Sequence, residues 1–60
     1  MDIKPWDKVL INIDDNGWKG IETICKDVQC GVAFLFSPLF PHTYYEVTEQ
    51  NRDRVEILHK

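Results

Sequence analysis

Apolar residues recur at every second position in several short stretches of the chain. Between residues 7 and 13, Val9, Ile11 and Ile13 fall on one side of an extended backbone, which is the period of a half-buried strand. The stretches that read as extended are short and rich in β-branched and aromatic residues. They predict five strands, over Asp7–Ile13, Ile21–Val28, Val32–Phe36, Thr43–Glu49 and Arg54–Leu58.

Turn-forming residues separate these stretches. Asn16 and Gly17 tolerate positive φ and predict a turn, with Gly20 as a second flexible point. Pro38 and Pro41 forbid regular pairing, so residues 37–42 are expected to form a loop. Residues 50–53 are polar and compatible with one turn of 3₁₀ helix, while a short helix over residues 50–60 stays as an alternative. Turns every 8–12 residues or so between short strands are typical of a small barrel or sandwich.

Two strands depart from simple alternation. Between residues 21 and 28, Ile21, Thr23 and Cys25 share one face while Ile24 and Val28 share the other, which predicts a bulge or strong curvature. Residues 32–36 are apolar on both faces, as expected of a central strand in a tightly curved barrel. Counting by alternation predicts a core of Val9, Ile11, Ile13, Ile21, Phe34, Phe36, Tyr45, Val47, Val55 and Ile57.

Several large apolar residues then lack an inward position. They are Trp6, Leu10, Trp18, Leu35, Phe40 and Tyr44. Exposed aromatic groups usually mark contact surfaces, where Trp and Tyr act as anchors. We expect Trp18 and Tyr44 to contact a partner, whereas Trp6 and Phe40 either plug the ends of the barrel or join that contact surface.

The whole pattern resembles the SH3-like barrel group, and within it the KOW-type and related small bacterial or phage barrels. The residues that carry the resemblance are a first strand at 7–11, a glycine-bounded loop at 17–20 and a closing strand at 54–58 after a 3₁₀ turn. Trp6 stands where the first strand of such modules usually has glycine, and the basic residues that KOW modules use for RNA are sparse. The resemblance therefore implies an all-β fold, a single small five-stranded SH3-like barrel over residues 1–60, and leaves RNA binding as an alternative.

The charge and length narrow the choice of function. The 60 residues suffice for one domain, and the formal net charge is −3. An acidic balance disfavours non-specific nucleic-acid binding and suits a basic protein surface. No segment reads as a signal peptide or a membrane span, so a cytoplasmic location without membrane contact is expected.

The chain offers little for catalysis or metal binding. Cys25 or Cys30 with His42 is the only conceivable nucleophile–base pair, and nothing in the sequence supplies a third, orienting group. The two cysteines are expected to be free thiols, with a disulfide and a metal site as the alternatives. Asp14 and Asp15 are consecutive carboxylates that do not follow the alternating pattern of a calcium loop. We therefore expect no enzyme activity, no cofactor, no metal and no small-molecule substrate.

The remaining hypothesis is a non-enzymatic protein-interaction module. Its partner would present a basic or aromatic surface, and the chain would act as a regulator or inhibitor of a nucleic-acid-handling protein, of the kind phages and mobile elements encode, or as an accessory subunit of a complex. A KOW-like nucleic-acid or ribonucleoprotein binder is the alternative. The residues expected to make the contact are Trp18, Tyr44, Phe40, Asp14, Asp15 and Lys19.

Overall fold

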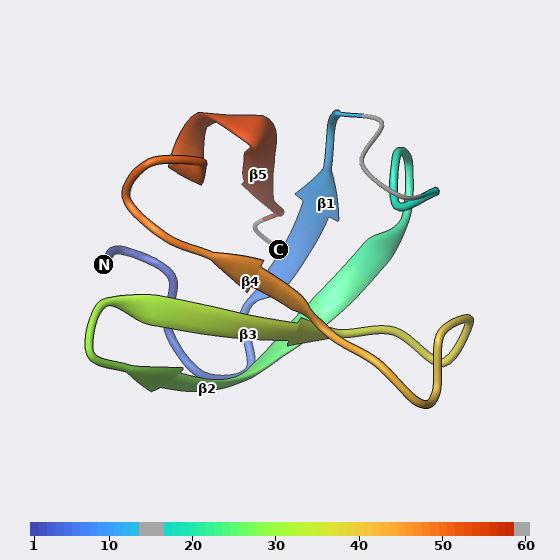
Figure 1. Cartoon of the computed structure of the whole chain (residues 1–60), viewed down its shortest axis with the longest axis horizontal. Coiled ribbons are helices and arrows are strands. Elements are labelled where there is room, and N and C mark those ends of the chain that lie inside the picture. The colour runs from blue at the N-terminus through green and yellow to red at the C-terminus, as the bar shows by residue number, and fades with distance from the viewer. Residues whose placement is uncertain (14–16, 59–60) are drawn as a thin grey trace.

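The protein is built from five antiparallel strands and almost no helix (Figure 1). A computed structural model of the chain describes residues 1–13 and 17–58. The elements are β1 (Lys8–Ile11), β2 (Glu22–Gln29), β3 (Val32–Phe36), β4 (Tyr45–Val47), the 3₁₀ helix η1 (Arg52–Arg54) and β5 (Val55–Leu58). The prediction of an all-β fold is confirmed, and so is a 3₁₀ turn before the last strand. Within the described residues, no helix has the length and apolar character needed to span a membrane.

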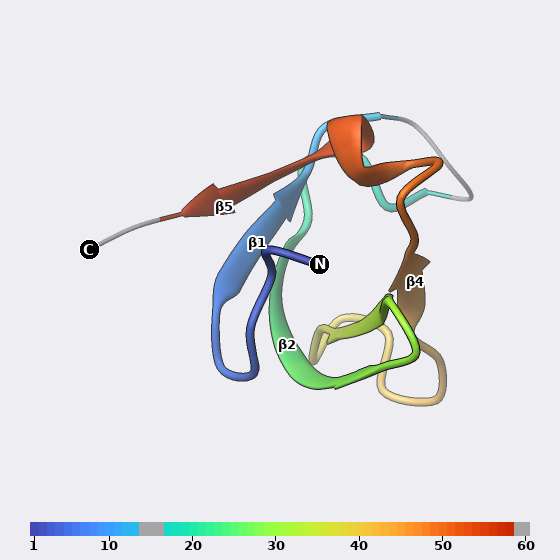
Figure 2. The same ribbon diagram turned by 90° about the vertical axis from the view of Figure 1, so that its left-hand side faces the viewer.

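The strands form one sheet in the order β4-β3-β2-β1-β5, curled into a half-barrel (Figure 2). β2 turns through the bend of the sheet and pairs with β1 at one end and β3 at the other. The two edges, β4 and β5, are not paired with each other within the described residues. The trough is therefore open along one side.

The irregular alternation of β2 has the cause that the sequence suggested. The register against β3 shifts between Cys25 and Asp27, so Lys26 is the extra residue of a β-bulge. Thr23 and Cys25 point inward, and Ile24 on the other face is partly exposed. The bulge bends the strand and lets one sheet wrap around a small core.

The side chains of β3 face the opposite way from the prediction. Ala33 and Leu35 are fully buried, whereas Phe34 and Phe36 are half-buried on the outer face. Because both faces of this strand are apolar, alternation alone does not show which face is buried. The concave side is already occupied by the rings of Trp18 and Tyr45, which belong to the same buried cluster as Ala33 and Leu35.

Other members of the core come from outside the strands. Trp18 is only 6% exposed, so the prediction that it lacks an inward position is wrong, as it is for Leu35. Ile3, before the first strand, is 1% exposed and packs into the same cluster. Ile13 is 39% exposed, so its predicted place in the core is wrong, because β1 ends at Ile11. The buried apolar cluster consists of Ile3, Val9, Ile11, Trp18, Cys25, Ala33, Leu35, Tyr45, Val47 and Val55.

An ion pair fixes the N-terminal segment beside Ile3. The Nε and Nη2 atoms of the Arg52 guanidinium each donate to the Asp2 carboxylate over 2.7 Å. Arg52 also donates through Nη1 to the Val55 carbonyl oxygen, 3.1 Å away. The segment is thus tied to η1, and Figure 2 draws the N-terminus within the curl of the sheet.

Trp6 occupies a backbone conformation that glycine normally fills. Its φ is 75°, it follows Pro5, and the Asp7 N–H donates to the Lys4 carbonyl oxygen over 3.1 Å, which closes a turn. The N–H of Trp6 donates to the Cys25 carbonyl, and the N–H of Cys25 donates to the Asp7 carbonyl. Trp6 and Asp7 therefore lie opposite the single residue Cys25, which is the pattern of a G1 bulge. Glycine adopts such a conformation at no steric cost, whereas tryptophan does not. The side chain of Trp6 is 73% exposed, so it is not a barrel plug.

Candidate functional site

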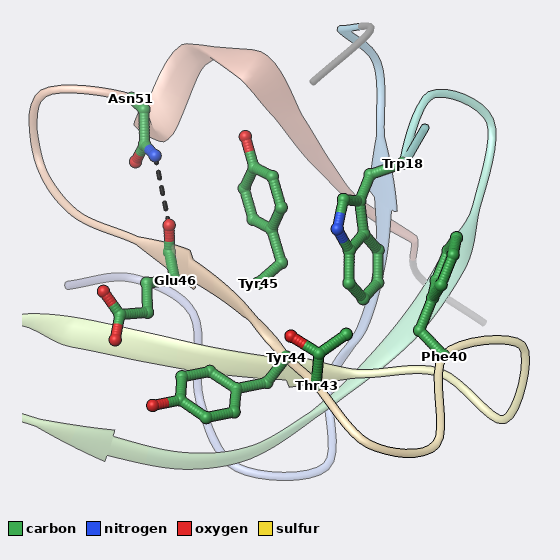
Figure 3. Close-up of a pocket in the computed structure, with 7 residues that line it drawn as sticks. All are labelled: Trp18, Phe40, Thr43, Tyr44, Tyr45, Glu46 and Asn51. Carbon is green, nitrogen blue, oxygen red and sulfur yellow. Dashed lines mark hydrogen bonds between the residues drawn. The ribbon is translucent and has the colours of Figure 1, made fainter. Parts of the chain in front are cut away.

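A hollow of about 460 Å³ lies at the edge of the sheet along β4 (Figure 3). Three of the aromatic residues singled out in the sequence, Trp18, Phe40 and Tyr44, are part of its lining. We call this feature the aromatic hollow and define it by Trp18, Phe40, Thr43, Tyr44, Tyr45, Glu46 and Asn51.

Trp18 forms the floor of the aromatic hollow. The turn from Trp18 to Ile21, closed by a 3.0 Å bond from the Ile21 N–H to the Trp18 carbonyl, contains Gly20 with φ 78°. This turn directs the indole inward, where its ring centroid lies 4.4 Å from that of Phe40 and 5.7 Å from that of Tyr45. Figure 3 shows the indole between these two rings. Such offset and edge-on contacts hold aromatic groups in a fixed geometry.

Two consecutive proline turns hold Phe40 over the indole. The Phe40 N–H donates to the Ser37 carbonyl over 3.0 Å, and the Thr43 N–H donates to the Phe40 carbonyl over 3.3 Å. Pro38 and Pro41 each take the second position of a turn, where their fixed φ is favourable. The loop of residues 37–42 is thereby constrained, and the wall of the hollow is formed before any ligand arrives.

Tyr44 belongs to both the aromatic hollow and the outer face of the sheet. It is 46% exposed, and its ring centroid is 5.5 Å from those of Phe34 and of Phe36. Lys26 places its Nζ 5.4 Å from the centre of the Phe36 ring. The register also sets Ile24 directly opposite Phe36. The outer face thus carries a second surface, of apolar and cationic side chains, which we call the outer row and which consists of Lys8, Ile24, Lys26, Phe36 and Tyr44.

The remaining residues expected at the contact surface are not all brought together. Lys19 is exposed next to Trp18, but it does not line the aromatic hollow. Asp14 and Asp15 lie outside the described residues. Glu46 and Asn51, which the sequence did not single out, line the hollow instead. No alternation pattern marks Asn51, because its role depends on a side chain that bonds back to β4.

The cysteines differ in their surroundings. Both are free thiols; Cys25 is buried and donates through its Sγ to the Asp27 carbonyl oxygen over 3.3 Å. Burial raises the pKa of the Cys25 thiol. Cys30 is exposed at the tip of the β2–β3 hairpin. In the described part of the chain, no three His, Cys, Asp or Glu side chains are placed to share a metal ion.

The fold and the hollow together define a small all-β half-barrel with an aromatic edge, compatible with a small SH3-like barrel. Comparisons with protein-family models, with curated proteins and with solved structures found no match to this chain. What it does has therefore to be argued from its own geometry.

Proposed function

We propose that the chain is a non-enzymatic protein-interaction module, on a barrel of the SH3-like type, that binds a partner protein at the aromatic hollow. The observation that carries the proposal is the tilted ring contact of Trp18 and Phe40 beside the exposed Tyr44. Aromatic residues that are held rigid and remain accessible lose little conformational entropy when a partner covers them.

The electrostatics favour a basic partner. The carboxylate of Glu46 lines the hollow, and no ion pair to it is found among the described residues. The formal net charge of −3 would speed the approach of a cationic surface. Binding of this kind suits a regulator or an accessory subunit of a larger assembly, acting in the cytoplasm.

Capture of the partner with matched variants tests this proposal. The tagged chain, Tyr44→Ala and Leu39→Ala are each used to capture proteins from nuclease-treated lysate of the host. Leu39 is 69% exposed in the loop beside Phe40 but does not line the hollow, so its variant is the control. Because Tyr44 also belongs to the outer row, Phe40→Ala is used beside it as a variant of the hollow that is not part of the outer row. A stoichiometric partner that the original chain and Leu39→Ala retain, and that Tyr44→Ala and Phe40→Ala both lose, supports the proposal. Equal capture by all four chains would exclude the hollow.

The outer row favours a second candidate, a KOW-like nucleic-acid binder. Lys26 over Phe36, with Lys8 opposite Ile24 on the same face, combines cations with aromatic rings as single-strand binders do. Such binding would weaken steeply with salt and would be lost from Lys26→Ala. Measuring the affinity for single-stranded RNA at two salt concentrations distinguishes it from a protein partner at the hollow.

A further inference from the structure

β4 is an edge strand, and the register shows which of its main-chain groups point away from β3. The β2–β3 hairpin closes with Gln29 opposite Val32, around Cys30 and Gly31, both at positive φ. A two-residue hairpin of this kind begins with a hydrogen-bonded pair, and antiparallel pairs then alternate. Val32 and Phe34 therefore direct their main-chain groups toward β2. Glu46 lies opposite Phe34, so its N–H and carbonyl point away from β3.

The side chain of Asn51 confirms this direction. Its Nδ2 donates to the Glu46 carbonyl oxygen over 3.1 Å, and its Oδ1 accepts the Thr48 N–H over 2.6 Å. One amide thus bonds two successive outward groups of the edge, as the backbone of a neighbouring strand would. Asn51 covers the edge of β4 up to Glu46 and no further. Among the described residues, no acceptor for the Glu46 N–H is found.

The uncovered part of this edge opens into the aromatic hollow. Tyr44, Tyr45 and Glu46 all line it, and Trp18 and Phe40 lie on the same side of β4 (Figure 3). An unpaired edge N–H beside an apolar wall has the two components of strand addition: main-chain bonds for affinity, and a place for alternate side chains.

We propose that an extended segment of the partner protein adds to the edge of β4 as a further strand. A carbonyl of that segment accepts the Glu46 N–H, and an apolar or aromatic side chain of the segment rests on Trp18 and Phe40. A Lys or Arg adjacent to that side chain pairs with the Glu46 carboxylate, because successive residues of a strand face opposite sides and Glu46 faces away from the buried Tyr45, which contacts Trp18. This inference rests on the proposed function and specifies its ligand as a basic, alternating, extended peptide.

Peptide selection supplies the probe for a test. A displayed library of random octapeptides is selected on the immobilised chain, with Phe40→Ala used to remove peptides that ignore the hollow. The enriched peptide is then synthesised in two N-methylated forms, each blocking alternate residues. A strand-forming peptide loses about tenfold or more in affinity in one form and little in the other, since only every second residue bonds to β4.

A protein variant tests the same bond from the other side. Glu46→Pro removes the edge N–H, and proline is tolerated in an edge strand where the N–H faces outward. Glu46→Ala keeps the N–H and removes only the carboxylate, so it is the matched control. Strand addition requires Glu46→Pro to bind the peptide more weakly than Glu46→Ala, with both variants folded by thermal unfolding. If Glu46→Pro does not fold, the N-methylated peptides still decide.

The outcomes separate the inference from the proposed function. Strand addition is supported if the peptide loses affinity in only one of its two N-methylated forms and the Glu46 amide proton exchanges more slowly in the complex. Binding that depends on Phe40 but tolerates both N-methyl patterns keeps the interaction module and overturns strand addition. Failure of any peptide to be enriched on the original chain over Phe40→Ala contradicts both.

Discussion

The main-chain N–H of Trp6 donates to the carbonyl of Cys25 over 2.6 Å, while Trp6 itself holds a φ of 75°. A bulky residue at positive φ is strained by about 1–2 kcal/mol relative to the same position occupied by glycine. The bond to Cys25 belongs to the bulge that starts the β1–β2 pairing, so the backbone keeps this conformation despite the strain.

Replacement of Trp6 by glycine is therefore expected to stabilise the domain. Trp6→Gly relieves the strain and loses little packing, because the side chain is 73% exposed. The gain is partly offset by the extra freedom of glycine in the unfolded chain, which leaves a net increase of up to about 1 kcal/mol in the free energy of unfolding. Urea denaturation measures it, and Trp6→Ala, which keeps the strained φ, serves as the control. A loss of stability in Trp6→Gly would show that the indole contributes to the fold.

Removal of the Asn51 side chain is expected to weaken the edge of β4. Asn51→Ala leaves the Glu46 carbonyl and the Thr48 N–H without the bonds that now satisfy them. A loss of about 1–2 kcal/mol in the free energy of unfolding follows, together with concentration-dependent association as the edge becomes available. Chemical denaturation and sedimentation measure the two effects. Gln50→Ala, at an exposed neighbour whose main-chain N–H donates to the Thr48 hydroxyl, should change neither.

The ion pair between Asp2 and Arg52 predicts a pH dependence at the acid end. Hydrogen bonds from the guanidinium lower the pKa of Asp2 from 3.8 to about 2. A carboxyl whose pKa is lower in the folded state adds stability above its unfolded pKa and loses it as the pH falls to the folded pKa. Asp2→Asn should therefore be less stable than the original chain at pH 6, and the difference should shrink progressively from about pH 5 and vanish at about pH 1, below both pKa values. A difference that persists undiminished at about pH 1 would mean that the charge is not its cause.

The two thiols are expected to react at very different rates. Cys25 is fully buried and its pKa is raised by that burial, so little thiolate is available to an external reagent. Cys30 is exposed at a hairpin tip. A disulfide-exchange reagent should modify one thiol per chain in the folded state and two in urea, and Cys30→Ser should abolish the fast reaction. Two fast equivalents in the folded chain would contradict the burial of Cys25.

The sequence was sufficient to predict the strands and insufficient to predict which of their side chains face the core. Strands β1 and β5 alternate between apolar and polar faces, and the inward positions Val9 and Val55 follow from that pattern. β3 is apolar on both faces, so which of its faces is buried depends on the space inside the trough. That space is filled by Trp18 from a loop and Ile3 from the N-terminal segment, which no period of two can identify.

The candidate site was predictable only in part, for a similar reason. Large aromatic residues left over from the strands marked Trp18, Phe40 and Tyr44, and these do line one hollow. Their division of roles was not readable, since Trp18 is the buried floor and Tyr44 the exposed rim. The contribution of Glu46 and Asn51 depends on which main-chain groups of β4 face outward, and this requires the register of three strands.

The central claim is that the aromatic hollow, and not the outer row, receives a protein partner. The most direct measurement records amide and indole NMR signals of the chain as the captured partner is added. We expect the largest shifts at the Trp18 indole N–H and at the amides of Tyr44 and Glu46, with the amides of Lys8 and Lys26 little changed. Shifts confined to Lys8, Lys26 and their neighbours on the outer face would contradict it.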